Sequence, residues 1–304
     1  MKIPLFPKTW MDGDITDTHS AQVPVTTHAL HYGTTAFEGM RAYWNGKNLN
    51  VFRVKEHIRR LHRSGLFYNI VAPYSEKEIS DAIIDLCIAN SIRENAYIRP
   101  MYFVGEWGID LYLNQDAPVR FVILTFPLKR YFAQSAISAC VVPTRRFSDQ
   151  SIPVKAKMGG NYLNSIAATL EAKQGGFDEA IMLDMSGCVS EGPGENIFLV
   201  QDGQLVTPDA ASSILDGITK DTIIWLADRL GIKTVHRRVA YSELHTADEI
   251  FMTGTAVEVC AIKRVGNHDI SGSPGEITTK LSNMYTDAVH GRGDVPEEWL
   301  MQVY

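Results

Sequence analysis

The sequence predicts a mixed α and β protein of two unequal halves, and three observations support this fold class. Segments with helical spacing of apolar residues alternate with short segments rich in aromatic and β-branched residues. The pattern breaks at residues 127–135 and then resumes. The 304 residues are enough for one large domain or two ordinary ones. We therefore expect a domain at residues 1–126, a linker at 127–135 and a second domain at 136–304.

The first half contains three predicted strands and two predicted helices. The strands are residues 50–54, 96–104 and 120–126, and the first helix is residues 55–67. Ser75 and Glu78 have the spacing of a capping box, which opens a second helix that continues to about Ala89.

The second half alternates more often between the two kinds of element. Predicted strands occupy residues 139–143, 179–183, 196–200, 204–206, 234–239 and 249–253. Helices are expected at residues 161–173, 219–230 and 277–288, the first two ending at glycines.

Composition narrows the function classes. The chain is 45% hydrophobic and 21% charged, with a formal net charge of −6 and no basic block. This charge balance predicts no basic surface that would bind nucleic acid or an anionic membrane. There is no apolar run of membrane-spanning length, no signal-peptide pattern and no Cys/His metal spacing around Cys87, Cys140, Cys188 and Cys260. These features predict a cytoplasmic protein with reduced thiols.

Lys157 is the first candidate for chemistry. It stands where a strand-like run ends and Gly159-Gly160 opens a helix. Glycines let the backbone approach a ligand closely, and a desolvated lysine there has a lowered pKa and a nucleophilic amine. Taken alone, a lysine beside two glycines is more often a solvated loop residue.

Four further segments are suggestive only together. Residues 190–196 carry Glu191 and Glu195 in a Gly-rich loop, and residues 217–219 and 253–256 offer backbone N–H groups and hydroxyls that suit a phosphate. Each is more often a simple turn or cap. Residues 28–39 carry His28 and His31 without a carboxylate or cysteine that would complete a metal site. A metal-dependent hydrolase is therefore a remote alternative.

Seven segments in one order resemble the branched-chain amino acid aminotransferases, within the fold-type IV class of pyridoxal 5′-phosphate (PLP) enzymes. They are HALHYGTTAFEGMRAY, VFRVKEHIRRLH, AYIRPMYFVG, AKMGGNYL, SEGPGENIF, ILDGIT and FMTGTAVE. The resemblance implies an α+β fold with a smaller N-terminal α/β domain and a larger, barrel-like C-terminal α/β domain that binds PLP.

The resemblance also assigns the cofactor residues. Lys157 matches the catalytic lysine that forms a Schiff base with PLP. Glu191, rather than Glu195, matches the carboxylate that pairs with the pyridine nitrogen and keeps it protonated. The other matching cofactor positions are Tyr162 near the phenolic oxygen, Arg60, Ile218, Thr219 and Thr255 at the phosphate, and Leu215 and Gly254.

The implied substrate pocket combines aromatic walls with an arginine. Its matching positions are Tyr32, Phe37, Gly39, Tyr97, Arg99, Tyr131, Thr255 and Ala256. Trp107, which lies in a loop that departs from the family pattern, is expected to reach the same pocket. Aromatic walls suit a branched aliphatic side chain. In bacterial relatives the positions of Tyr97 and Arg99 receive the side-chain carboxylate of glutamate or 2-oxoglutarate, so one pocket holds both kinds of substrate.

Residues 105–112 depart from the family pattern, and in the family this loop reaches a neighbouring subunit. The resemblance therefore implies at least a homodimer, and homohexamers occur. Other reactions on the same scaffold remain open: (R)-amine transamination, D-amino acid transamination and the aminodeoxychorismate lyase reaction. A non-catalytic PLP-binding protein is a further alternative.

Overall fold

The structure is a computed structural model that describes residues 4–304, and it divides into two compact units. The first unit extends to Lys129 and also includes Ala156–Gly160 and Ala288–Tyr304. The second comprises Arg130–Lys155 and Asn161–Asp287. The boundary between Lys129 and Arg130 falls within the expected linker. The expected second domain included residues 156–160 and 288–304, which belong to the first unit here, so the two units are of similar length.

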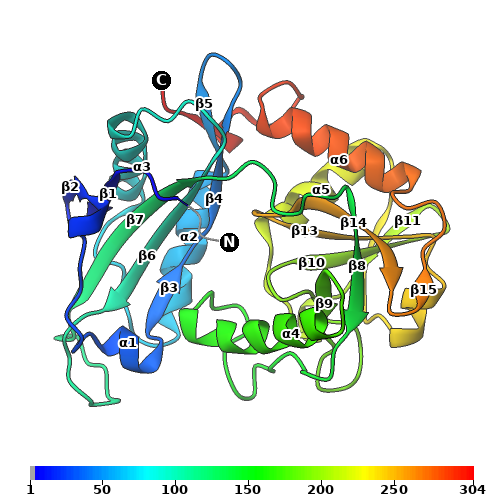
Figure 1. Cartoon of the computed structure of the whole chain (residues 1–304), viewed down its shortest axis with the longest axis horizontal. Helices are drawn as coiled ribbons and strands as arrows, with labels where there is room; N and C mark the ends of the chain where they lie inside the picture. The colour runs from blue at the N-terminus through cyan, green and yellow to red at the C-terminus, as the bar shows by residue number, and fades with distance from the viewer. Residues whose placement is uncertain (1–3) are drawn as a thin grey trace. The chain divides into compact units, whose positions relative to one another are not determined.

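The first unit is built on an antiparallel sheet of eight strands (Figure 1). The strands are β1 (Lys8–Met11), β2 (Asp14–Asp17), β3 (Thr35–Phe37), β4 (Met40–Trp44), β5 (Leu49–Phe52), β6 (Ala96–Val104), β7 (Val119–Pro127) and β16 (Leu300–Gln302). Their order is β16-β5-β4-β6-β7-β1-β2, and β3 also pairs with β6. The long pair β6 and β7 keeps one register over its whole length, which fixes the faces on which its side chains lie.

Three helices accompany this sheet: α1 (His28–Tyr32), α2 (Val54–Leu66) and α3 (Glu76–Ala89). The side chains of Ile58 and Leu61 on α2 and of Ile83 and Leu86 on α3 are fully buried in one apolar core with the sheet. The capping box predicted at Ser75 and Glu78 is confirmed, since both of its hydrogen bonds form at the start of α3. Short helical turns also occur at Thr18–Ser20 and Glu297–Trp299.

The second unit has a mixed sheet of eight strands. They are β8 (Ala136–Val141), β9 (Glu179–Ile181), β10 (Asn196–Gln201), β11 (Gln204–Thr207), β12 (Thr234–His236), β13 (Glu249–Gly254), β14 (Glu258–Val265) and β15 (His268–Asp269). The order is β12-β11-β10-β13-β14-β8-β9, with β15 paired to β14. The pairs β11–β12, β14–β8 and β8–β9 are parallel and the others are antiparallel. The mixed α+β class is confirmed.

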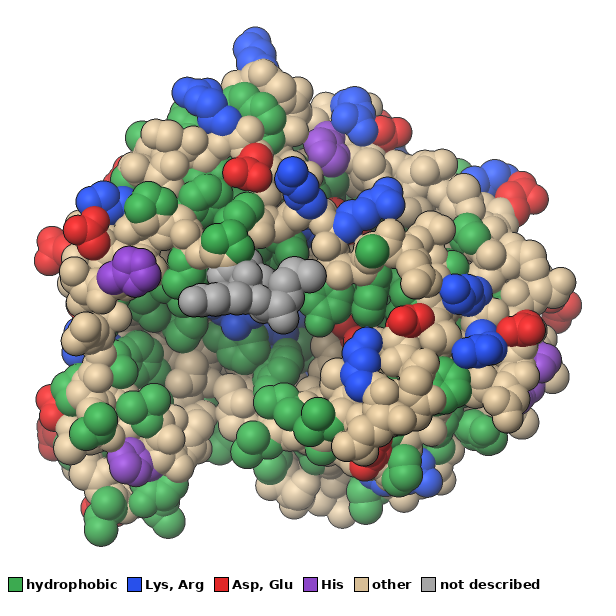
Figure 2. All heavy atoms as spheres, viewed as in Figure 1, with side chains coloured by type: hydrophobic (Ala, Val, Ile, Leu, Met, Phe, Trp, Pro, Cys, Tyr) green, Lys and Arg blue, Asp and Glu red, His purple; other side chains and the backbone are tan. Residues whose placement is uncertain are grey.

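The helices of the second unit are α4 (Tyr162–Gln174), α5 (Ile218–Arg229) and α6 (Glu276–Val289), the last two residues of α6 belonging to the first unit. Turns of 3-10 helix lie at Ala210–Ser212 and Tyr241–His245, and a further turn at Gly159–Asn161 begins in the first unit and ends in the second. The apolar core of this unit lies around β10, β13 and β14, with Leu199, Ile250 and Ile262 almost completely buried. On the face seen in Figure 2, basic and acidic side chains are interspersed, in keeping with the modest net charge. None of the helices in residues 4–304 is long and apolar enough to cross a membrane.

Candidate active site

Lys157 is held through its backbone at the start of a turn in the first unit. Its N–H donates to Ser64 Oγ at 2.9 Å, and its carbonyl accepts from the N–H of Phe37 at 3.1 Å. Met158 forms a β-bridge with Ala36, and Gly159 and Gly160 begin the 3-10 turn that leads into α4. The residues before Lys157 form turns rather than the strand-like run that the sequence suggested. The lysine is therefore positioned by pairing with β3 and α2.

Close backbone contact with this turn explains the glycine at position 33. The Cα of Gly160 would lie 2.8 Å from a Cβ at Gly33, which has φ +67 and ends α1. A side chain at Gly33 would therefore collide with the turn that follows Lys157. The Nζ of Lys157 lies 5.1 Å from the centre of the Phe37 ring, a predicted substrate-lining residue.

The neighbouring lysine, Lys155, has a different environment. Its Nζ lies 3.1 Å from Asp216 Oδ2, and the two side chains are about half exposed. A pair so open to water contributes little free energy. Neither Lys155 nor Lys157 lies in a strand.

Arg99 and Tyr97 lie two residues apart on β6 and face Phe37. Arg99 Nη2 donates to Tyr97 Oη at 3.2 Å, and the guanidinium lies 4.5 Å from the centre of the Phe37 ring. Gly39 also lies against Tyr97, since a Cβ at position 39 would lie 1.7 Å from Tyr97 Oη. Within the first unit, the structure therefore brings together Lys157, Phe37, Gly39, Tyr97 and Arg99.

Arg60 lies on α2, one turn after His57, and both side chains meet Glu38. Arg60 Nε and Nη2 donate to Glu38 Oε1 and Oε2 at 2.5 and 2.8 Å, and His57 Nδ1 lies 2.7 Å from Oε2. Glu38 is fully buried. Burial alone would raise the pKa of this carboxyl, but the charge of Arg60 and the hydrogen bonds from Arg60 and His57 hold the pKa well below its usual value. The sequence interpretation did not assign Glu38 or His57.

The remaining residues predicted in the first half lie near the divergent loop. Tyr32 Oη donates to the carbonyl of Ile109 at 3.3 Å, and Trp107 Nε1 donates to the carbonyl of Tyr112 at 3.1 Å. His28, considered for metal, has Nδ1 2.9 Å from Thr34 Oγ1 and Nε2 3.0 Å from the carbonyl of Asp110. His28 thus holds this loop, and no group of three metal-ligating side chains occurs anywhere in residues 4–304.

Glu191 is the centre of the polar group in the second unit. Its Oε2 accepts from Asn196 Nδ2 at 3.0 Å and from the Leu215 N–H at 3.1 Å, and Oε1 lies 2.9 Å from Arg146 Nε. Glu191, Asn196 and Arg146 are each more than nine-tenths buried. The two hydrogen bonds orient this carboxylate, and the nearby guanidinium favours its charged form. Glu195 instead accepts from the N–H of Gly194 at 3.0 Å, which is a local turn.

Asn196 also joins Glu191 to the start of α5. Its Nδ2 donates to the Leu215 carbonyl at 2.9 Å, and a Cβ at Gly217 would lie 1.9 Å from its Oδ1. Gly217 is the N-cap of α5 and provides no side-chain cap, and the first two helical residues, Ile218 and Thr219, are buried. A helix N-terminus without a side-chain cap is suited to a phosphate.

Thr255 and Ala256 lie at the turn between β13 and β14, after Gly254. Gly254 packs close to the chain, since a Cβ there would lie 3.2 Å from the Gly194 carbonyl oxygen. Tyr162 is the first residue of α4 and is partly exposed. In the second unit the structure therefore brings together Glu191, Leu215, Ile218 and Thr219.

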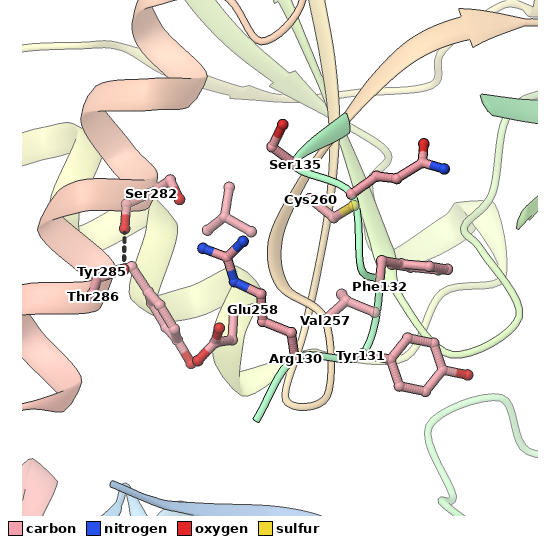
Figure 3. Close-up of a pocket in the computed structure, with 12 residues that line it drawn as sticks. Arg130, Tyr131, Phe132, Ser135, Val257, Glu258, Cys260, Ser282, Tyr285 and Thr286 are labelled. Atoms are coloured by element: carbon pink, nitrogen blue, oxygen red, sulfur yellow. Dashed lines mark hydrogen bonds between the residues drawn. The ribbon is translucent and has the colours of Figure 1, made fainter. Parts of the chain in front are cut away.

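A cavity of about 140 Å³ lies beside the predicted substrate residue Tyr131. It is lined by the segment from Arg130 to Ser135, by the start of β14 and by α6, as Figure 3 shows. The ring of Tyr131, which is 52% exposed, packs edge-on against Phe132 at 4.9 Å. Of the predicted substrate positions, this cavity involves Tyr131 only.

The residues fit a pyridine-type cofactor with a phosphate. A buried ionised carboxylate is the partner that a protonated ring nitrogen needs. Within the second unit, a helix start without a side-chain cap and a buried threonine are donors of the kind that bind phosphate. The sequence assigned no role to Glu38 or Asn196, although both lie inside quoted segments, and Arg146 lies in none of those segments. In the sequence, the available signal for the buried Glu38 was the pair His57 and Arg60, which lie three residues apart on one predicted helix.

Comparisons with known proteins agree with this chemistry. The family model described as amino-transferase class IV matches residues 35–265. The branched-chain-amino-acid aminotransferase of Escherichia coli strain K12 is 38% identical over 299 residues, covering 97% of this chain and 96% of that protein.

Solved structures are similar over the whole chain. The branched-chain aminotransferase of the thermophilic archaeon Thermoproteus uzoniensis, crystallised with norvaline, is 40% identical with a TM-score of 0.95, covering 98% of this chain and 99% of that one. The T.th. branched-chain amino acid aminotransferase, complexed with N-(5′-phosphopyridoxyl)-L-glutamate, is 36% identical with a TM-score of 0.95, covering 100% of both chains. The chain belongs to the class IV aminotransferases.

Proposed function

We propose that this protein is a PLP-dependent branched-chain amino acid aminotransferase. It transfers the amino group of L-leucine, L-isoleucine or L-valine to 2-oxoglutarate, giving a branched 2-oxo acid and L-glutamate. The observation that carries this proposal is the 38% identity to an enzyme of that name over nearly the full length of both chains. The positions of Lys157, Glu191 and Arg99 in the two units support it.

PLP, when bound, supplies an electron sink that stabilises the negative charge developing at the substrate Cα. Lys157 would hold the cofactor covalently, and its amine would take the proton from the substrate Cα and later return it as a general acid. Glu191 keeps the cofactor's ring nitrogen protonated, and its contacts with Asn196, Leu215 and Arg146 hold that carboxylate in place.

The group around Arg99 supports recognition of two unlike substrates. Phe37 and Tyr97 provide aromatic surface for a branched aliphatic side chain, which gains free energy by leaving water. Arg99 and the Tyr97 hydroxyl are donors for the second carboxylate of glutamate or 2-oxoglutarate. The adduct in the T.th. enzyme carries a glutamate, so a protein of this fold accommodates that substrate.

The proposal also covers the cellular location and the oligomeric state of the enzyme. We propose a cytoplasmic homo-oligomer of at least two chains. Exposed apolar side chains in the divergent loop, Ile109, Leu111 and Tyr112, are each more than 70% exposed and would be covered in such an assembly. Sedimentation of the purified protein measures the number of chains, and a monomer would contradict this part.

An absorption spectrum of the purified protein, recorded before and after L-leucine alone, tests the function. We expect a yellow protein that bleaches as the amino group moves to the cofactor. A protein that ignores L-leucine and bleaches with D-alanine or an (R)-amine would keep the cofactor and contradict the substrate. A protein that stays colourless after added PLP would contradict the whole proposal.

A further inference from the structure

Glu38 is a fully buried carboxylate that no substrate or cofactor role explains. It stands between Phe37 and Gly39, two positions predicted to line the substrate pocket. Burying an ionised carboxylate is costly unless cations and hydrogen bonds compensate for the lost water. The contacts of Glu38 with its partners therefore indicate the role of this buried carboxylate.

Arg60 is the principal partner. Two of its nitrogens, Nε and Nη2, donate to the two carboxylate oxygens at 2.5 and 2.8 Å, so the contact is bidentate. The Arg60 side chain keeps only 15% of its exposure. A bidentate pair fixes both the position and the plane of a guanidinium, which a single contact does not.

His57 occupies a further position on the same carboxylate. Its Nδ1 lies 2.7 Å from Glu38 Oε2. Burial lowers the pKa of His57, and the charges of Arg60 and Lys157 lower it further, although Glu38 opposes them. A neutral imidazole then donates a hydrogen bond through Nδ1 to Glu38. The carboxylate keeps its negative charge, which pairs with Arg60.

The backbone of the same segment is tied to the other candidate residues. The Phe37 N–H donates to the carbonyl of Lys157 at 3.1 Å, and the Glu38 N–H donates to the carbonyl of Pro100, next to Arg99, at 2.9 Å. The Gly39 N–H lies 3.3 Å from Glu38 Oε2. Residues 37–39 thus connect α2, the turn at Lys157 and strand β6 within one unit.

We infer that Glu38 is a positioning residue for the cofactor phosphate, acting by fixing the Arg60 guanidinium in the orientation that receives it. This inference rests on the proposed function, because it takes PLP as the cofactor. Glu38 also offsets part of the positive charge of Arg60, which by itself would weaken phosphate binding. Orientation outweighs this because a guanidinium held in advance loses less freedom when it binds the phosphate.

The test compares PLP with pyridoxal, which has the same aldehyde and ring but no phosphate. Both are titrated by absorbance into the full-length chain after its cofactor has been removed. The ratio of the pyridoxal to the PLP dissociation constant isolates the phosphate, since the reaction with Lys157 is common to both. In Glu38→Gln we expect PLP to bind on the order of tenfold more weakly and pyridoxal to bind nearly as in the wild type, so the ratio falls.

Two variants serve as benchmarks. Arg60→Gln should lower the ratio at least as much as Glu38→Gln, because it removes the phosphate donor itself. His57→Gln removes the other partner of the same carboxylate, so it should destabilise the fold while changing the ratio less than threefold. If pyridoxal binds too weakly to measure, the dissociation constant of inorganic phosphate from the cofactor-free chain replaces it, with the same order of variants.

The outcomes separate the inference from the proposed function. A wild type that binds no PLP overturns the proposed function. A lowered ratio in Arg60→Gln with an unchanged ratio in Glu38→Gln overturns the role of Glu38 alone. Equal loss of PLP and pyridoxal in Glu38→Gln assigns Glu38 a merely structural role and also overturns the inference. Should Glu38→Gln not fold, Glu38→Asp, which keeps the charge but shortens its reach, should lower the ratio in the same direction.

Discussion

Lys157 is the residue on which the proposed chemistry depends, and the structure anchors its backbone rather than leaving it in an open loop. Replacing Lys157 with alanine should abolish turnover, because no other group then moves the proton at the substrate Cα. General acid–base groups contribute about 10²–10⁴-fold, and loss of the covalent link adds to this.

The measurement for Lys157→Ala is the rate of leucine-dependent bleaching, together with a PLP titration. On the proposed function the variant should still bind PLP, because the other proposed cofactor residues are unchanged. Lys155→Ala is the matched control, because Lys155 forms an exposed pair with Asp216. A fully active Lys157→Ala enzyme would contradict the mechanism.

Gly217 supports a second prediction about single residues. A Cβ at this position would lie 1.9 Å from Asn196 Oδ1, and Asn196 is buried and hydrogen-bonded to Glu191. Gly217→Ala should therefore displace Asn196 and weaken PLP binding, by about tenfold for an overpacking cost of about 1.4 kcal/mol. A PLP titration measures it. Gly194→Ala is the control, since nothing lies within 4 Å of a Cβ there, and equal affinities in both variants would contradict the role of Asn196.

Elements whose signals are local were predicted well from the sequence. Helices α3, α4 and α6 and strand β6 have apolar spacing or capping residues within their own segments, and they begin and end within one or two residues of the prediction. The strands β3, β4 and β14 were missed. Residues 28–39 show no clear period, because their side chains are distributed over a short helix, a turn and a strand that the sheet holds in place.

The residues of the candidate site also divide into those with a local signal in the sequence and those without one. Lys157, Glu191 and Arg99 lie in recognisable motifs, so the sequence could indicate them. Arg146 meets Glu191 across 45 positions of the chain, and no pattern in either segment indicates that contact. Glu38 was hidden for the same reason, since its partners lie on another element. Buried ion pairs are set by tertiary structure and do not show in local sequence.

The capping box of α3 gives a prediction at the scale of one element. Ser75 accepts from the N–H of Glu78, and the Glu78 side chain accepts from the N–H of Ser75. Ser75→Ala should lower the free energy of unfolding by about 1 kcal/mol. Ser80→Ala in the same helix is the control, because its hydroxyl only bonds back to the Glu76 carbonyl and the change should be near zero. Urea unfolding measures both, and equal losses would contradict the capping role.

At the scale of the whole molecule, residues far apart in sequence share a unit. Residues Ala156–Gly160 belong to the first unit because Phe37 and Ser64 hold the backbone of Lys157 and Ala36 pairs with Met158. The predicted division at residues 127–135 could not anticipate this return of the chain. Position in the sequence is therefore a poor guide to which unit carries a catalytic residue.

Acid stability is the last prediction and concerns the folded molecule as a whole. The pKa of His57 is lowered from 6.5, so between its folded value and 6.5 the unfolded chain binds more protons. The pKa of Glu38 is lowered from 4.5, with the same consequence below pH 4.5. Both groups therefore make the free energy of unfolding fall as the pH falls, first below about 6.5 and then more steeply below about 4.5.

Urea unfolding between pH 7.5 and pH 4, in wild type and in Glu38→Gln, isolates this effect. Glu179 acts in the opposite direction, because burial raises its pKa and its charged form opposes folding above pH 4.5, but it is present in both proteins and cancels in the difference. The gap in stability between wild type and variant should be largest at neutral pH and should narrow as the pH falls to 4.5 and below, because at residue 38 only the unfolded wild-type chain then gains a proton. A gap that stays constant with pH would mean that the folded and unfolded chains bind protons at Glu38 equally, which would contradict the ionised, paired state of this residue.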